Sequence, residues 1–170
     1  MKLRPKPGDY DPYYQLYIEK VIEWDLLEAL KFIHTDTQSF LLSIPEEKGG
    51  FRYAEGKWSI SEVINHLMDC ERIIAYRALR FARKDYTDLP GFDENAYAPN
   101  ANAERFTLAE LAKQFQNIRT CTIDLFTSFT ESMLDEKGPA NGNIVSVLAL
   151  GYIITGHEVH HLGVIRDRYL

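Results

Sequence analysis

Residues 143–169 read NIVSVLALGYIITGHEVHHLGVIRDRY, a stretch in which apolar residues recur at helical spacing. On a helix that turns about 100° per residue, His157 and His161 lie about 40° apart and one turn above each other. Buried imidazoles need polar partners, and two stacked rings can share one divalent ion at about 2.1 Å per Zn–N bond. The stretch therefore predicts a long helix that contributes two metal ligands. The apolar residues on the same face are Leu150, Ile153, Ile154, Val164 and Ile165.

Two other interpretations of this motif stay open. The first is the H-E-x-x-H signature of zinc proteases, in which Glu158 is the base. That signature needs a further ligand, usually downstream, and no histidine occurs in residues 162–170. The second is a pair of hydrogen-bonded core histidines without a metal. His160 falls at the edge of the stripe, about 60° from His157, where a surface or substrate-facing position is favoured over ligation.

A third ligand must come from upstream, and His66 is the best candidate. It lies on the border of the apolar stripe of a helix predicted over residues 59–84. His34, in the first long helix, is the competing candidate. Three histidines with an open position are typical of a catalytic metal site. Glu62 and Asp69 are helical neighbours of His66 and are candidates to orient ligands or move protons.

Two further residues of this helix are candidates for substrate binding. Cys70 lies one turn from His66, and we interpret it as a core residue, with a soft ligand or a reactive thiol as the alternative. Arg77 is a candidate to bind an anionic substrate group. Its simpler interpretation, shared with Arg80, is a cation that complements the C-terminus of the helix.

The chain has 170 residues, which predicts a single domain over residues 1–170 with a sizeable core. A net charge of −6 argues against a nucleic-acid-binding surface. The longest mostly apolar run, Ile144–Thr155, is too short to span a bilayer, and no signal-peptide pattern opens the sequence. Two cysteines form no disulfide framework. We therefore expect a cytoplasmic protein with neither membrane nor nucleic-acid partners.

Helix start signals divide the chain into four long helices. Ser59 with Glu62, and Thr107 with Glu110, have the spacing of capping boxes. No segment alternates as a strand does. Three prolines make residues 1–12 an irregular arm. The predicted helices cover residues 13–22, 25–43, 59–84, 107–129 and 143–169, with Asn143 as the cap of the last.

These elements predict an all-α four-helix bundle. The link between the second and third long helices, residues 85–106, has 22 residues and is long enough for a crossover that leaves those helices parallel. The order is then up-down-down-up. In the link, Asp93 is a candidate to reach a metal or its water, and Phe92 and Tyr97 are candidates to line a pocket. The alternative is a structural strap fixed by its aromatic residues.

The last predicted helix has a second apolar face, away from the histidines. We expect this face to make a dimer contact or to be covered by the N-terminal arm. Its residues are Leu148, Tyr152, Val159 and Leu162.

Three motifs resemble those of the DinB/YfiT-like superfamily. Its second-helix signature is similar to residues 56–62, GKWSISE, followed by His66. Its long loop is similar to residues 89–93, LPGFD, and its fourth-helix motif to residues 156–163, GHEVHHLG. The resemblance covers nearly the whole chain. It implies an up-down-down-up bundle, usually a homodimer. It also implies a divalent metal, zinc or nickel, on His66, His157 and His161.

Activities differ within the superfamily that the chain resembles. Some members are thiol-dependent transferases or isomerases that use bacillithiol, mycothiol or glutathione, and others are assigned as metal-dependent hydrolases. From the resemblance we expect a metal-dependent thiol S-transferase that acts on small electrophiles, with a low-molecular-weight thiol as co-substrate. The alternatives are a hydrolase that uses water on the metal, and a non-enzymatic, stress-related metal-binding dimer.

Overall fold

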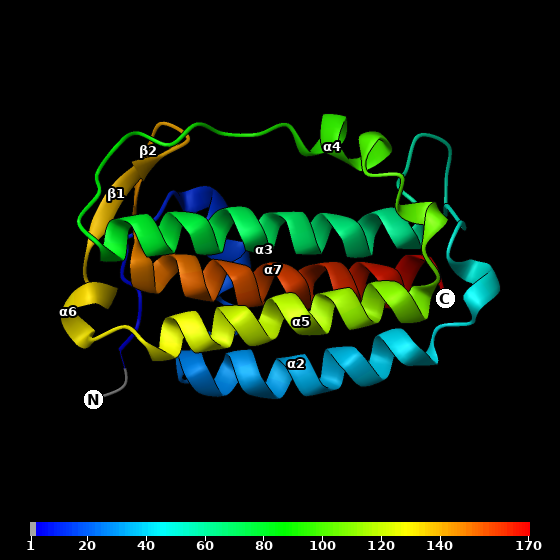
Figure 1. Ribbon diagram of the computed structural model, residues 1–170, viewed down its shortest axis with the longest axis horizontal. Helices are drawn as coiled ribbons and strands as arrows, with labels where there is room; N and C mark the ends of the chain where they lie inside the picture. The colour runs from blue at the N-terminus through cyan, green and yellow to red at the C-terminus, as the bar shows by residue number, and fades with distance from the viewer. Residues whose placement is uncertain (1–2) are drawn as a thin grey trace.

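The computed structural model describes residues 3–170, and four long helices form the core of this part of the chain (Figure 1). Helices α2 and α7 run in one direction and α3 and α5 in the opposite direction. Helix α3 packs between α5 and α7, and α2 closes the bundle against the same two helices. The predicted up-down-down-up bundle is confirmed. The bounds of these helices are Leu26–Ser43 for α2, Ile60–Ala82 for α3, Leu108–Thr127 for α5 and Val147–Arg168 for α7.

The long helices begin largely where their capping signals place them. Ser59 accepts a hydrogen bond from the amide of Glu62 at 3.2 Å, and the Glu62 carboxylate accepts one from the amide of Ser59 at 2.7 Å. Thr107 and Glu110 make the same reciprocal pair at the start of α5. Such a box satisfies donors that the first helical turn leaves without partners.

The crossover from α3 to α5 runs along the outer side of α3 (Figure 1). It contains helix α4, Glu94–Asn100, and a 3-10 helix, Ala103–Arg105, neither of which was predicted. Asp93 caps α4, because its carboxylate accepts hydrogen bonds from the amides of Asn95 and Ala96. The crossover therefore lies as an ordered strap over α3, and parallel α3 and α5 follow from its length.

The prediction that no segment forms a strand was wrong. Strands β1, Lys137–Ala140, and β2, Asn143–Ser146, pair as an antiparallel hairpin after the short helix α6, Glu131–Leu134. The turn residues Asn141 and Gly142 both have positive φ, 54° and 76°, as the tight turns of two-residue hairpins require. Because the hairpin occupies Asn143, this residue does not cap α7. Ser146 does, and its hydroxyl accepts a hydrogen bond from the amide of Ala149 at 3.1 Å.

The N-terminal segment packs along α7. A 3-10 helix, Pro12–Tyr14, leads into the short helix α1, Gln15–Ile18, which ends four residues before the predicted end at residue 22. Arg4 donates a hydrogen bond to the Tyr152 hydroxyl at 2.8 Å, and that hydroxyl donates to the carbonyl of Trp24 at 2.9 Å. The second apolar face of α7 was expected to make a dimer contact or to be covered by the N-terminal arm. The arm contacts this face at Tyr152. Residues 1–2 of the predicted arm lie outside the described part.

A glycine brings α1 close to α7. A Cβ atom at Gly156 would overlap the backbone of Tyr17, so only glycine permits this approach. The contact places the Tyr17 ring beside His157, with ring centroids 5.3 Å apart. Among residues 3–170, no helix combines the length and the apolar character needed to cross a membrane.

Candidate metal centre

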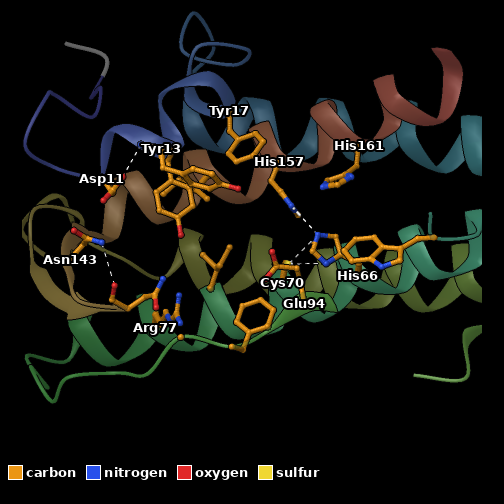
Figure 2. A pocket seen from close by; sticks show the side chains of 17 residues that line it. Asp11, Tyr13, Tyr17, His66, Cys70, Arg77, Glu94, Asn143, His157 and His161 are labelled. Carbon is orange, nitrogen blue, oxygen red and sulfur yellow. Dashed lines mark hydrogen bonds between the residues drawn. The ribbon is translucent and has the colours of Figure 1, made fainter. Parts of the chain in front are cut away.

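The structure brings together the three histidines that the sequence analysis proposed as ligands (Figure 2). His66 projects from α3, and His157 and His161 project from adjacent turns of α7. Nε2 of His66 lies 3.2 Å from Nε2 of His157, and one nitrogen from each of the three rings lies within 4.8 Å of the others. Nitrogens so close to one another can coordinate a single ion from three sides.

All three imidazoles are held neutral. Burial lowers the pKa of His66 to about 4, with the Glu94 carboxylate acting in the opposite direction. Burial, reinforced by His66 and His160, lowers the pKa of His161 to about 3, and burial with the neighbouring histidines lowers the pKa of His157 well below its usual value. Neutral imidazole is the form that binds metals.

The chemistry of this cluster fits a divalent transition metal. Imidazole nitrogen is a good ligand for zinc, nickel and copper. Within residues 3–170, no carboxylate accepts a hydrogen bond from any of the three rings, and the polar contacts of His66 are with His157 and the Cys70 thiol. Three histidines leave one position of a tetrahedral metal open, as in catalytic zinc sites.

A pocket of about 490 Å³ opens beside the imidazoles. Its walls come from α3, α7, the N-terminal segment, the start of the crossover and the hairpin turn (Figure 2). Its volume is in the range of small-molecule sites. The predicted residues Cys70, Arg77 and Phe92 line it together with the three histidines.

Cys70 lies against His66 without joining the cluster. Its Sγ is 3.5 Å from Nδ1 of His66, but it is not part of the group of atoms close enough to share an ion. Burial raises the pKa of the Cys70 thiol to about 12, with the Asp69 and Glu94 carboxylates acting in the same direction. The protonated thiol is a weak nucleophile, because the thiolate is the reactive form.

The three carboxylates proposed as catalytic groups do not line the pocket. Glu62 completes its capping box and pairs with Arg52 at 3.0 Å. Asp69 pairs with Arg72 at 3.1 Å, and Asp93 caps α4. All three make local contacts that hold helices and their ends in place.

Tyr97, His160 and His34 also lie outside the pocket lining. The Tyr97 ring is exposed and packs on Phe92 with centroids 5.3 Å apart. His160 packs edge-on against Tyr17 and His161. His34, the competing ligand candidate on α2, does not join the cluster of the other three histidines.

The pocket lining includes residues that the sequence analysis missed. Glu94 is the carboxylate that acts electrostatically on His66, and Tyr14, Tyr17 and Trp58 supply aromatic walls. One signal was present in the sequence, since a glycine inside a helical pattern, here Gly156, often marks a close approach of another segment. The contribution of Glu94 depends on the path of the crossover, which no local pattern specifies.

Comparison with known proteins agrees with this geometry. The family model described as the DinB superfamily matches residues 29–165. A protein of Oceanobacillus iheyensis named "Putative metal-dependent hydrolase" is 30% identical over 156 residues, covering 87% of each chain. A protein of Geobacillus thermodenitrificans with the same name is 22% identical over 158 residues, covering 91% of this chain and 86% of the relative.

Two solved structures from Bacillus subtilis share the fold. YfiT, described as "a probable metal-dependent hydrolase with an unusual four-helix bundle topology", superposes with a TM-score of 0.70 at 15% identity, covering 98% of this chain and 91% of YfiT. A DinB-like protein superposes with a TM-score of 0.59 at 20% identity, covering 83% of this chain and 86% of its own. At these identities the likeness concerns the fold alone.

Proposed function

Because this chain belongs to the DinB superfamily, we propose that it is a metal-dependent enzyme in which His66, His157 and His161 hold one divalent cation, zinc or nickel. One observation carries the proposal: three neutral imidazoles converge at the wall of an open pocket of about 490 Å³. When bound, such a cation supplies a Lewis acid that brings the pKa of a nucleophile near neutrality.

The reaction we propose is hydrolysis of a small molecule, with water as the nucleophile. The names of the two relatives support this choice over the thiol transfer expected from the sequence. We assign Glu94 as the proton acceptor, because it lines the pocket and acts electrostatically on His66. Asp11, the other carboxylate of the lining, already accepts a hydrogen bond from the amide of Tyr13 at 2.8 Å.

Transfer of a thiol to a small electrophile is the second candidate. The protonated Cys70 is a poor nucleophile, so the thiol must enter from solution, and the pocket has room for a low-molecular-weight thiol. The third hypothesis is a non-enzymatic metal-binding protein, which predicts that the three histidines are closed to small molecules. The open pocket beside them argues against it.

A panel of activity assays distinguishes hydrolysis, thiol transfer and a non-enzymatic role. We would load the protein with zinc or nickel and assay chromogenic esters and anilides without thiol, then thiols with a chromogenic electrophile. We expect thiol-independent turnover that a chelator abolishes and added metal restores. Turnover only with thiol would replace hydrolysis by the second candidate, and activity that survives metal removal would overturn both.

A matched pair of variants tests Glu94. Glu94→Gln keeps the shape of the side chain and removes its ability to accept a proton, so we expect kcat to fall about 100-fold or more with metal content unchanged. Glu104→Gln, an exposed carboxylate paired with Arg52, is the control and should leave kcat unchanged. Equal activity in the two variants would remove Glu94 from the proposal.

A further inference from the structure

Arg77 lines the pocket at the end remote from the histidines (Figure 2). His66 and Arg77 are eleven residues apart on α3, so they lie within about 20° of the same helix face and about 16 Å apart along the axis. Cys70 and Ile74 lie between them on this face and also line the pocket. One face of α3 therefore runs from the imidazoles, through a less polar middle, to a guanidinium.

The guanidinium of Arg77 is buried and has no anionic partner in the described part of the chain. Arg77 is 6% exposed, and within the described residues its Nη2 donates a hydrogen bond to the carbonyl of Pro90 at 2.7 Å. A guanidinium has five N–H donors. A buried cation without a counter-charge is costly, so an anion that enters the pocket here would be stabilised.

The neighbours of Arg77 suit the same ligand. Tyr14 lines this part of the pocket and is close enough for Arg77 to act on its hydroxyl electrostatically, and the Asn143 side chain lies at this end as well (Figure 2). The lining also presents the apolar side chains of Ile74 and Ile153. Of the two carboxylates of the lining, Glu94 lies near His66. Asp11 lies at the same end as Arg77, where it accepts a hydrogen bond from the amide of Tyr13 and makes no ion pair with Arg77.

We propose that the substrate carries an anionic group, a carboxylate or a phosphate, that pairs with Arg77. An apolar segment joins this anion to the bond that reacts at the histidines. His66 and Arg77 lean in the same direction along α3, so the spacing between anion and reacting bond is set by the rise of about 16 Å between the two residues. The inference rests on the proposed function, since it names the substrate class of the same site.

Calorimetric titration with non-reactive probes tests the inference. Hexanoate, hexyl phosphate and hexanol share one apolar chain and differ in the head group. We expect at least one of the two anions to bind about 10-fold or more tightly than hexanol, and the better anion identifies the head group. Titrations would use chelator-treated protein, so that a probe cannot gain affinity by binding a metal.

Variants assign the preference to one side chain. Arg77→Met keeps the length and removes the charge, so the preference for the anion should fall about 10-fold or more, while Arg77→Lys should retain part of it. Arg80→Met is the control, since Arg80 pairs with Asp85 at 2.6 Å and does not line the pocket. Circular dichroism would check that each variant folds.

Two results would overturn the inference: hexanol binding as tightly as both anions, or Arg77→Met keeping the preference. The first comparison uses the unchanged chain and decides the matter even if Arg77→Met fails to fold. Metal-dependent turnover of neutral esters with no anion preference would leave the proposed function standing and remove this inference. Anion binding through Arg77 without any turnover would do the reverse.

Discussion

Two buried polar clusters lie on neighbouring turns of α3 and α7, and they differ in what satisfies them. One is an ion layer made of Glu71, Arg119, Glu158 and Thr37. Arg119 donates two hydrogen bonds to Glu71, each 2.8 Å long, and its Nη1 lies 2.6 Å from Glu158. Thr37 donates to Glu158 at 2.5 Å, so each of the four long helices contributes one residue.

The histidine cluster begins one residue before Glu158, and within the described residues none of its rings forms an ion pair. Its rings contact one another and face a pocket, whereas the ion layer is closed, with Arg119 fully buried. Polar groups that satisfy one another inside the protein hold the four helices in register. Neutral imidazoles that contact one another beside an opening can bind a cation that enters from the pocket. The contrast separates a structural cluster from a functional one within a few residues of sequence.

Removing the cation of the ion layer should have the largest effect. Arg119→Met leaves two carboxylates buried without a counter-charge, and we expect a loss of about 3–5 kcal/mol in the free energy of unfolding, measured with urea. Arg166→Met is the control, because Arg166 forms a solvent-exposed ion pair with Asp36. This variant should lose less than about 1 kcal/mol in the free energy of unfolding. Similar losses in the two variants would show that the layer does not stabilise the fold.

Removing a histidine should affect metal uptake far more than folding. We expect His66→Ala, His157→Ala or His161→Ala to weaken zinc binding more than about 100-fold, since even partners of ligands contribute 10–100-fold. His160→Ala and His34→Ala are controls that should keep the ion. Metal analysis gives occupancy, and urea unfolding of the metal-free variants gives stability. Full occupancy in His66→Ala would break the assignment.

A glycine pair tests how far the histidine cluster depends on α1. Gly156→Ala pushes a methyl group into the backbone of Tyr17, and we expect a loss of about 1–3 kcal/mol in the free energy of unfolding. Gly163→Ala lies about two turns further along α7 in open space and should stabilise the helix by about 0.5–1 kcal/mol. Thermal unfolding distinguishes the two. Equal shifts in the melting temperature would mean that α1 does not depend on Gly156.

Acid should weaken the metal-free protein gradually. His66 has a folded pKa of about 4 against an ordinary 6.5, so below pH 6.5 the unfolded chain binds a proton that the folded chain rejects, and stability falls as pH falls. For His66 alone the loss is about 1 kcal/mol over the first pH unit below that value. Urea unfolding at a series of pH values measures it. The loss should be smaller in His66→Ala, and identical slopes would contradict the assignment.

The parts of this structure that the sequence predicted rest on local patterns. Capping boxes and apolar stripes mark helix starts and buried faces within a few residues, so α3 and α5 were expected near their observed positions. The spacing of His157 and His161 fixes their common face in the same way. The hairpin was missed although Asn141-Gly142 is a strong turn signal, because its strands have four residues each and show little alternation.

The ion layer and the pocket walls depend on contacts that one sequence does not specify. Glu158 was interpreted only as part of the H-E-x-x-H pattern, since its partner Arg119 is on another helix, 39 positions away. Glu94 reaches the pocket because the crossover passes over α3. Local reasoning therefore proposed the histidines but not the carboxylate beside them.

The crossover has a consequence for how this fold can diversify. The connection that lets α5 start parallel to α3 also supplies Phe92 and Glu94 to the pocket, while the imidazoles project from the rigid helices beneath it. Substitutions or length changes in that strap can reshape the entrance without disturbing the nitrogens below. The shape of the entrance can therefore change while the ligands on α3 and α7, and Arg77 on α3, stay in place.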